Sequence, residues 1–115
     1  MLTRAEVIAF CKTFPQVYED YPFDDGEWTA MRHTGNKKTF AFIFERQGKI
    51  WINVKAEPMS AEFWQSVFAS VVPAYHMNKR HWISIILDGT MSDTDIQTLI
   101  LESYTLTKPK IKATH

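Results

Sequence analysis

The chain has 115 residues, a length that supports one hydrophobic core, so we predict a single domain over residues 1–115. Its 13 lysine and arginine residues balance 13 aspartate and glutamate residues, which argues against a protein that holds DNA phosphates by a large overall positive charge. A single cysteine excludes an intramolecular disulfide and a cysteine zinc cluster. Because no apolar run approaches about 20 residues and no secretory signal pattern is present, we expect no membrane contact and a cytoplasmic location.

The first predicted element is a helix that starts at Thr3. Thr3 and Glu6 have the spacing of a capping box, in which the two residues satisfy each other's backbone N–H groups. Pro15 ends the helix, because the residue before a proline is forced out of the helical region. Four apolar residues follow helical spacing and should face the core: Val7, Phe10, Cys11 and Phe14.

Three strands are predicted next, at 28–33, 39–45 and 49–55, because apolar and β-branched residues alternate there with a period of two. Glycine-containing turns at 34–38 and 46–49 would join them into an antiparallel meander. In the second strand the alternation predicts one face with Phe40, Phe42 and Phe44 and another with Ala41 and Ile43. In the third strand it places Trp51 and Lys55 on a face that could be partly open.

The second half of the chain is predicted to be helix, strand and helix. A helix starts near Ser60, a favourable N-cap, and Pro73 marks its end. A short apolar strand over 81–88 follows, and a last helix starts at Ser92 and ends before Pro109. The apolar stripe of the middle helix comprises Phe63, Trp64, Val67, Phe68 and Val71, and the last helix would bury Ile96, Leu99, Ile100 and Ser103.

This order, α-β-β-β-α-β-α, predicts an α+β fold of two layers. A mainly antiparallel sheet would carry the helices on one face. The basic tail at about 108–115 is expected to be frayed.

Metal binding and catalysis are not supported by residue spacing. His76 and His81 lack a third ligand at a suitable spacing, and no H-E-x-x-H motif occurs. The acidic stretch 18–28 holds five acids, but an EF-hand register built on Gly26 places Tyr21 and Phe23 where oxygen ligands are required. The sequence contains neither a nucleophile elbow nor a phosphate-binding loop. We therefore expect no catalytic residue, no metal site and no cofactor.

The stretch 74–82, "AYHMNKRHW", combines basic, aromatic and hydrogen-bonding residues without an acid. The turn at 34–38 adds two lysines at the tip of a hairpin. Basic side chains can contact phosphates, amides can bond phosphates or base edges, and aromatic rings can stack on bases. The candidate nucleic-acid-binding residues are Lys37, Lys38, His76, Asn78, Lys79, Arg80, His81 and Trp82.

Two other interpretations of the same stretch stay open. In the first, Tyr75 and Trp82 lie in the core, Asn78 caps a turn, and Lys79 and Arg80 point into solvent. In the second, the stretch forms a pocket with Trp51, and the chain is an adaptor for a protein or a small ligand.

The segment 73–82, of the form P-x-Y-H-M-N-K-x-H-W, together with "LDG" at 87–89 and "EDYPF" at 19–23, resembles the MmcQ/YjbR family. The resemblance covers nearly the whole chain. It implies a CyaY-like α+β fold and DNA binding through two wing-like elements, with His76, Asn78, Lys79, His81 and Trp82 matching the family pattern and Arg80 adding charge. Frataxin-type relatives of this fold bind iron through an acidic first helix. Here that helix has Glu6 as its acid, which argues against an iron role.

Overall fold

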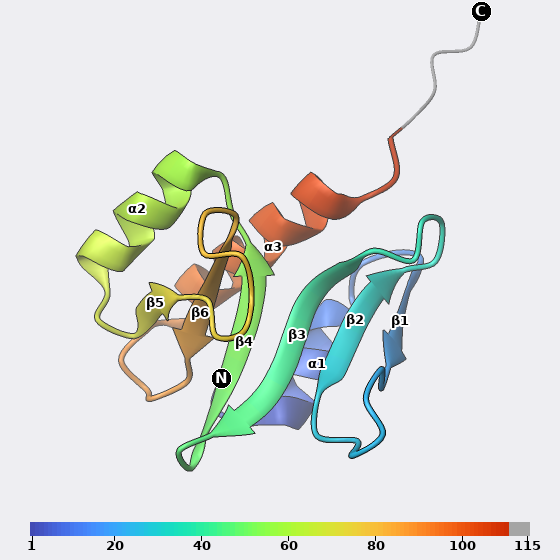
Figure 1. Ribbon diagram of the computed structural model, residues 1–115, viewed down its shortest axis with the longest axis horizontal. Helices are drawn as coiled ribbons and strands as arrows, with labels where there is room; N and C mark the ends of the chain where they lie inside the picture. Colours follow the sequence, from blue (N-terminus) through green and yellow to red (C-terminus); the bar gives the residue numbers. More distant parts are fainter. Residues whose placement is uncertain (111–115) are drawn as a thin grey trace, which may run out of the picture.

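A computed structural model describes residues 1–110, over which the chain forms three helices and a six-stranded antiparallel sheet (Figure 1). The strand order is β1-β2-β3-β4-β6-β5. The predicted α+β class is therefore confirmed. No helix in this part of the chain is long and apolar enough to cross a bilayer. The elements are α1 (Arg4–Cys11), β1 (Val17–Asp20), β2 (Thr29–His33), β3 (Thr39–Arg46), β4 (Lys49–Lys55), α2 (Pro58–Val67), β5 (Val71–Pro73), β6 (Trp82–Ile86) and α3 (Asp93–Thr107).

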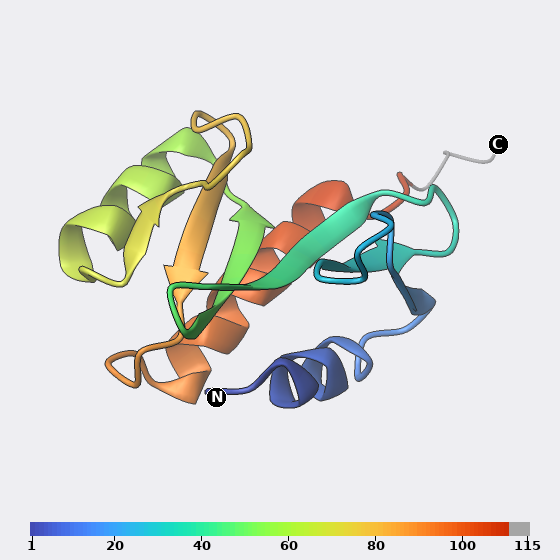
Figure 2. The same cartoon turned by 60° about the horizontal axis from the view of Figure 1, so that its bottom comes forward.

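Helices α1 and α3 lie against the same face of the sheet, as predicted (Figure 2). The capping box of Thr3 and Glu6 is present, and Ser92 caps α3 by accepting a hydrogen bond from the Asp95 backbone N–H at 3.2 Å. Helix α2 lies beside β5, the outer strand at one edge of the sheet. The predicted frayed tail is described here as far as Lys110, and residues 111–115 lie outside the described residues.

Two short strands were absent from the predicted order. β1 occupies part of the acidic stretch and pairs with β2, where Asp20 accepts a hydrogen bond from Arg32 Nε at 2.8 Å. β5 pairs with β6 over three residues and ends at Pro73. Neither segment carries a run of alternating residues long enough to be distinguished from a loop. The observed order is α-β-β-β-β-α-β-β-α.

The predicted bounds and packing of the middle helix were wrong. Helix α2 starts at Pro58, with Glu57 as N-cap, while the Ser60 hydroxyl donates to Glu102 on α3 at 2.7 Å. The helix ends at Val67, and Val71 belongs to β5. Proline is favoured at the first helical position, and this preference decided the start. The predicted apolar stripe is only partly buried, because Trp64 and Phe68 pack on the core whereas Phe63 and Val67 are 57% and 52% exposed.

A bulge in β3 overturns the predicted common face of its three phenylalanines. The pairing with β2 shifts between Met31 and Arg32, which leaves Phe40 outside the regular alternation. The Phe40 ring therefore packs on the helix side, 5.3 Å from the Tyr104 ring centroid on α3. Phe42 and Phe44 remain on the opposite face, which no helix in the described chain covers.

His33, in β2, is buried between this aromatic cluster and α3. Its ring centroid lies 5.2 Å from Phe40 and 4.6 Å from Tyr104, and Nε2 lies 2.8 Å from the Thr107 hydroxyl. That hydroxyl donates to the Ser103 carbonyl at 2.7 Å, so it accepts from Nε2–H. Burial lowers the pKa of His33 below its ordinary value of 6.5.

We expect the stability of the fold to fall as the pH drops below about 6.5, because the unfolded chain then binds a proton at His33 that the folded chain resists. The free energy of unfolding should be highest above this pH and should decrease below it by at most about 1.4 kcal/mol per pH unit. Urea denaturation between pH 8 and pH 5 measures this slope. His33→Gln should flatten it, whereas His76→Gln, at an exposed position, should not. Equal slopes in both variants would contradict the assignment to His33.

Candidate functional site

The candidate site is the loop between β5 and β6, residues 74–81, which crosses the uncovered face of the sheet. Asn78 organises its turn. The side-chain Oδ1 accepts from the Arg80 backbone N–H at 2.9 Å, and the Asn78 carbonyl accepts from the N–H groups of His81 at 3.3 Å and Trp82 at 3.0 Å. Asn78 therefore acts as a turn cap. Because Oδ1 is used in this turn, the Nδ2 amino group is the part of the amide left to donate outward.

The loop is fastened to the sheet by two fully buried polar residues, Asn53 on β4 and Ser84 on β6, which are direct cross-strand partners. Asn53 Nδ2 donates to the Tyr75 carbonyl at 2.8 Å, and the Tyr75 N–H donates to the Ser84 hydroxyl at 3.0 Å. The Ser84 hydroxyl in turn donates to Asn53 Oδ1. We call these three residues the loop latch. Both backbone groups of Tyr75 are satisfied by side chains, so the position of the loop is set by the sheet below it.

The Tyr75 side chain joins an aromatic layer on the same face of the sheet. Its ring centroid lies 5.8 Å from that of Phe44 and 6.2 Å from that of Trp51. The Arg46 guanidinium covers this layer, with its central carbon 4.4 Å from the Tyr75 ring centroid and 4.8 Å from the Trp51 ring centroid. Such stacking of a guanidinium on aromatic faces is a cation–π contact.

The remaining predicted residues of this loop differ in exposure. His76 is exposed and has a left-handed backbone, with φ of 60°. Lys79, Arg80 and His81 are exposed, and the His81 carbonyl accepts from the Ala56 N–H at 3.0 Å. Trp82 is half-buried, with its ring centroid 6.0 Å from that of Phe42. Six of the eight candidates thus belong to one segment of the sequence, which leads into β6.

The other two candidates, Lys37 and Lys38, are exposed in the turn between β2 and β3. This turn is anchored from both sides. Arg32 donates to the Lys37 carbonyl at 3.0 Å, and Asn36 Nδ2 donates to the Thr107 carbonyl on α3 at 2.9 Å. The turn therefore has a fixed position relative to the helix layer.

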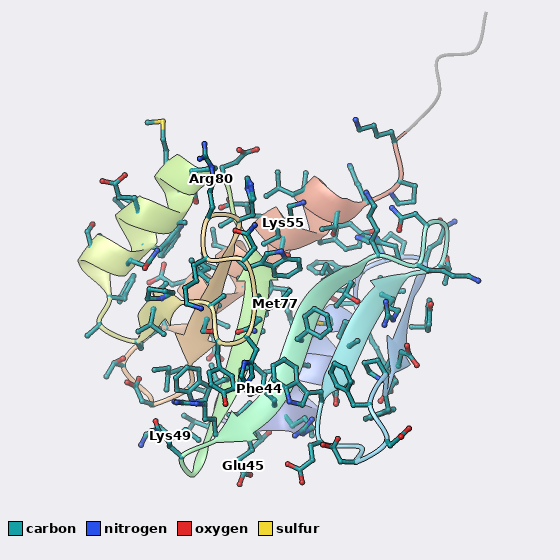
Figure 3. The ribbon with its side chains drawn as sticks, viewed as in Figure 1. Phe44, Glu45, Lys49, Lys55, Met77 and Arg80 are labelled. Carbon is teal, nitrogen blue, oxygen red and sulfur yellow. The ribbon has the colours of Figure 1, made fainter. Side chains whose placement is uncertain are left out.

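Strand register places both basic segments at the same end of the sheet. Trp82, the first residue of β6, pairs with Lys55, and the preceding residue of β4 pairs with Ala41 near the start of β3. The 34–38 turn leads directly into β3, and the 74–81 loop leads directly into β6. Figure 3 shows Arg80 and Lys55 at this end of the sheet and Lys49 at the opposite end.

Two acids of the 18–28 stretch are paired with basic side chains within the domain. Glu19 pairs with Lys12, and this lysine, together with the Tyr21 hydroxyl, holds the pKa of the Glu19 carboxyl below its usual range. Asp20 pairs with Arg32. Within residues 1–110 no group of three or more histidine, cysteine, aspartate or glutamate side chains is placed to hold a metal ion.

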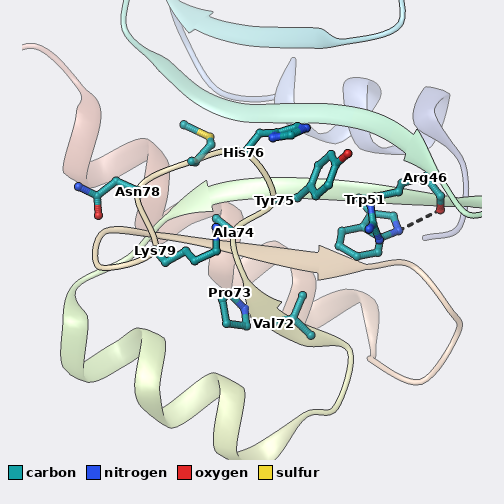
Figure 4. A pocket seen from close by; sticks show the side chains of 10 residues that line it. Arg46, Trp51, Val72, Pro73, Ala74, Tyr75, His76, Asn78 and Lys79 are labelled. Atoms are coloured by element: carbon teal, nitrogen blue, oxygen red, sulfur yellow. Dashed lines mark hydrogen bonds between the residues drawn. The ribbon is translucent and has the colours of Figure 1, made fainter.

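Two hollows lie on either side of His76 and Met77. The first has a volume of about 580 Å³ and contains no acidic residue in its lining (Figure 4). The second, of about 520 Å³, has the rings of Trp28 and Phe42 and the Asp25 side chain in its lining. The first hollow is lined by Arg46, Trp51, Val72, Pro73, Ala74, Tyr75, His76, Met77, Asn78 and Lys79.

Three residues that shape this site were not among the predicted ones: Arg46, Asn53 and Ser84. A weak signal existed for the latch, since Asn53 and Ser84 interrupt two otherwise apolar strands. A polar residue in the middle of a buried strand requires a partner, and pairing the two strands would have suggested one. Arg46 carried no such signal, because its contacts depend on where Tyr75 lies.

Comparison with known proteins places the chain in a family. The family model YjbR matches residues 12–106. YyaQ of Bacillus subtilis is 34% identical over 119 residues, covering 94% of this chain and 100% of that protein. YjbR of Escherichia coli K12 is 28% identical over 103 residues, covering 90% and 85% of the two chains.

Solved structures agree with this assignment. The crystal structure of DR2400 of Deinococcus radiodurans has a TM-score of 0.83 at 28% identity, covering 92% of this chain and 78% of that one. A Pseudomonas syringae protein has a TM-score of 0.81 at 27% identity, covering 91% and 98%. The resemblance carried by the 73–82 and 19–23 segments is confirmed: this chain belongs to the YjbR family.

Proposed function

We propose that the protein is a non-enzymatic DNA-binding protein. The observation that carries the proposal is the shared position of the 34–38 turn and the 74–81 loop at one end of the sheet. Both segments are rich in exposed basic side chains, and neither contains an acid. Two basic elements projecting from one end of a rigid sheet give a surface that can follow a phosphate backbone.

The electrostatics of the basic side chains support the proposal. Within residues 1–110, the ion pairs formed by side chains involve Lys12 and Arg32, so Lys37, Lys38, Lys79 and Arg80 keep their charges available. A neutral chain with a local basic end can bind DNA weakly, with an affinity that depends strongly on salt concentration. Asn78 Nδ2 and the exposed imidazoles of His76 and His81 would add hydrogen bonds to phosphate oxygens.

The half-buried Trp82 has a more limited role in this proposal. Its ring packs on Phe42, so it supports the base of the loop and presents only part of its surface to a ligand. The left-handed backbone at His76 turns the chain sharply just after the latched Tyr75. After half-buried Met77, residues 78–81 are exposed, so a large ligand could reach them.

A second candidate function is an adaptor for a small ligand or a protein. The observation in its favour is the pair of hollows beside His76 and Met77, both bordered by aromatic residues. Concave sites with a few polar groups among apolar walls are typical of ligand binding. The two functions share Asn78 and Lys79 and differ in the rest of the surface, since DNA would also contact Arg80 and the 34–38 turn, whereas a ligand would contact the walls of a hollow.

Fluorescence anisotropy with labelled duplex and single-stranded DNA, over a series of salt concentrations, tests the DNA-binding proposal. We expect binding at low salt that weakens linearly in a plot of log affinity against log salt. Lys79→Ala/Arg80→Ala should reduce the slope by about 2, because each phosphate contact contributes roughly 0.9. Lys49→Ala, which removes a charge at the opposite end of the sheet, is the control. Undetectable binding at low salt, or an unchanged slope in the double variant, would refute the proposal.

A further inference from the structure

Arg46 is a positioned cation without a partner. Its guanidinium carbon lies over the Trp51 and Tyr75 rings, and among residues 1–110 it has neither a carboxylate within ion-pair distance nor a side-chain hydrogen bond to the protein. A contact with aromatic rings supplies no oxygen or nitrogen acceptor, so the guanidinium N–H groups remain available to an acceptor on a ligand. A half-buried arginine with five free donors is suited to an oxyanion, which it can bind with two parallel hydrogen bonds.

The hollow beside Arg46 has donors and cations in its lining but no acid. Figure 4 shows Arg46 and Trp51 at one end of the hollow and Asn78 and Lys79 at the other. Asn78 offers its Nδ2 group, since its Oδ1 is engaged by the Arg80 N–H. Between the two ends, Val72 and Pro73 supply apolar surface. The positive charge and the hydrogen-bond donors of the hollow favour an anion. The apolar surface between its two ends favours an anion attached to a small apolar group.

One acid that lines a hollow together with Arg46 is engaged elsewhere. Asp88 lines a separate, smaller hollow on the other side of Arg46 and Trp51. Its carboxylate accepts from the Thr90 hydroxyl at 2.6 Å and from the Thr90 N–H at 3.0 Å, and these bonds lower its pKa. Asp88 thus has its own partner, and Arg46 remains available to a ligand.

The site is rigid before any ligand arrives. The Trp51 indole N–H donates to the Arg46 carbonyl at 3.1 Å, which fixes the ring relative to the end of β3. The loop latch fixes Tyr75 through both of its backbone groups. The rings that hold Arg46 are therefore set by the fold, and little conformational entropy would be lost when an anion binds.

From these contacts we propose that the hollow between Arg46 and Lys79 binds a small organic oxyanion, a phosphate or a carboxylate attached to an apolar body. Arg46 binds the oxyanion. Asn78 supplies a hydrogen-bond donor and Lys79 a positive charge at the other end of the hollow, and Val72 and Pro73 pack against the apolar part of the ligand. The site shares Asn78 and Lys79 with the proposed DNA-binding surface, but its principal anion ligand is Arg46 at the end of β3, which has no part in that surface. The two proposals can therefore fail separately.

NMR titration of the intact protein with phenyl phosphate and with benzoate tests this site. The reporters are the Trp51 indole N–H and the Arg46 Nε–H, and benzyl alcohol is the neutral control. We expect saturable shifts of both reporters with at least one of the two anions and none with benzyl alcohol. The tighter of the two anions identifies the oxyanion, phosphate or carboxylate. Absence of a saturable shift with either anion would overturn the proposal.

Three variants, each of which removes one positive charge, distinguish binding at this site from a general attraction of anions to the protein. Arg46→Gln should weaken binding roughly tenfold or more, as expected for loss of a charge-assisted hydrogen bond. Lys79→Gln, at an exposed position that should not affect folding, should weaken it several-fold. Lys49→Gln, at the start of β4 and outside the lining of the hollow, should leave the affinity within about twofold of the native value, as is usual for a screened surface charge. Equal losses in Lys49→Gln and Arg46→Gln would overturn the proposal. If the protein binds phenyl phosphate but not DNA, the anion site is supported and the proposed DNA-binding function is refuted.

Discussion

Phe40→Ala is expected to lower the free energy of unfolding by about 3–5 kcal/mol, the range for a fully buried phenylalanine. Phe40 is 0% exposed and contacts Phe14, His33 and Tyr104, which belong to three different parts of the chain. Its removal would leave a cavity between the sheet and the C-terminal half of α3, which can collapse only if the helix moves. Urea denaturation followed by circular dichroism measures the loss.

Phe42→Ala is the matched control, because it is the same substitution two residues away in the same strand. Phe42 is half-buried on the uncovered face, so we expect it to cost about half as much as Phe40→Ala, in proportion to the apolar area removed from water. The comparison tests the bulge directly. Equal losses at the two positions would contradict the difference in burial that the bulge gives Phe40 and Phe42.

Asn53→Ala is expected to lower the free energy of unfolding by about 2–3 kcal/mol, because it removes the centre of the loop latch and leaves buried polar groups without partners. The Tyr75 carbonyl loses its donor, and the Ser84 hydroxyl loses its acceptor. We also expect faster hydrogen exchange in residues 74–81, since the loop is no longer fixed from below.

Ser84→Ala and the double variant complete this test. Because both residues act in one hydrogen-bonded group, the loss in the double variant should be smaller than the sum of the single losses by about 1 kcal/mol. Asn36→Ala serves as control. It removes another amide hydrogen bond, from the 34–38 turn to α3, and should not alter hydrogen exchange in the 74–81 loop. Strictly additive losses for Asn53 and Ser84 would argue against a shared latch.

The long elements of this fold could be predicted from local pattern, because their apolar residues recur in the sequence at the spacing of a helix or a strand. Helix α3 has a favourable N-cap and buries Ile96, Leu99, Ile100 and Ser103, which follow one side of the helix. β3 and β4 alternate clearly and are joined by a glycine turn. In these segments local preference and tertiary packing agree.

The errors arose where tertiary pairing decides. Val71 has suitable spacing for α2, yet it lies in β5 and pairs with Ile85 of β6, because the edge of β6 offers it backbone partners. Phe40 fits the alternation in the sequence of β3, but the bulge places its side chain on the other face. The basic residues of the candidate site could be predicted from the composition of the 74–82 stretch. The roles of Arg46, Asn53 and Ser84 could not be predicted, because they depend on contacts between the strands and the loop.

The two outer strands of the sheet also influence how the protein behaves at high concentration. An exposed strand edge can recruit a strand from another molecule, and sheets aggregate in this way. Here β1 carries Glu19 and Asp20, both in ion pairs, and β5 has three residues and ends in Pro73, which lacks a backbone N–H. Both borders are therefore poor templates for intermolecular pairing, and the open sheet resists growth into larger assemblies.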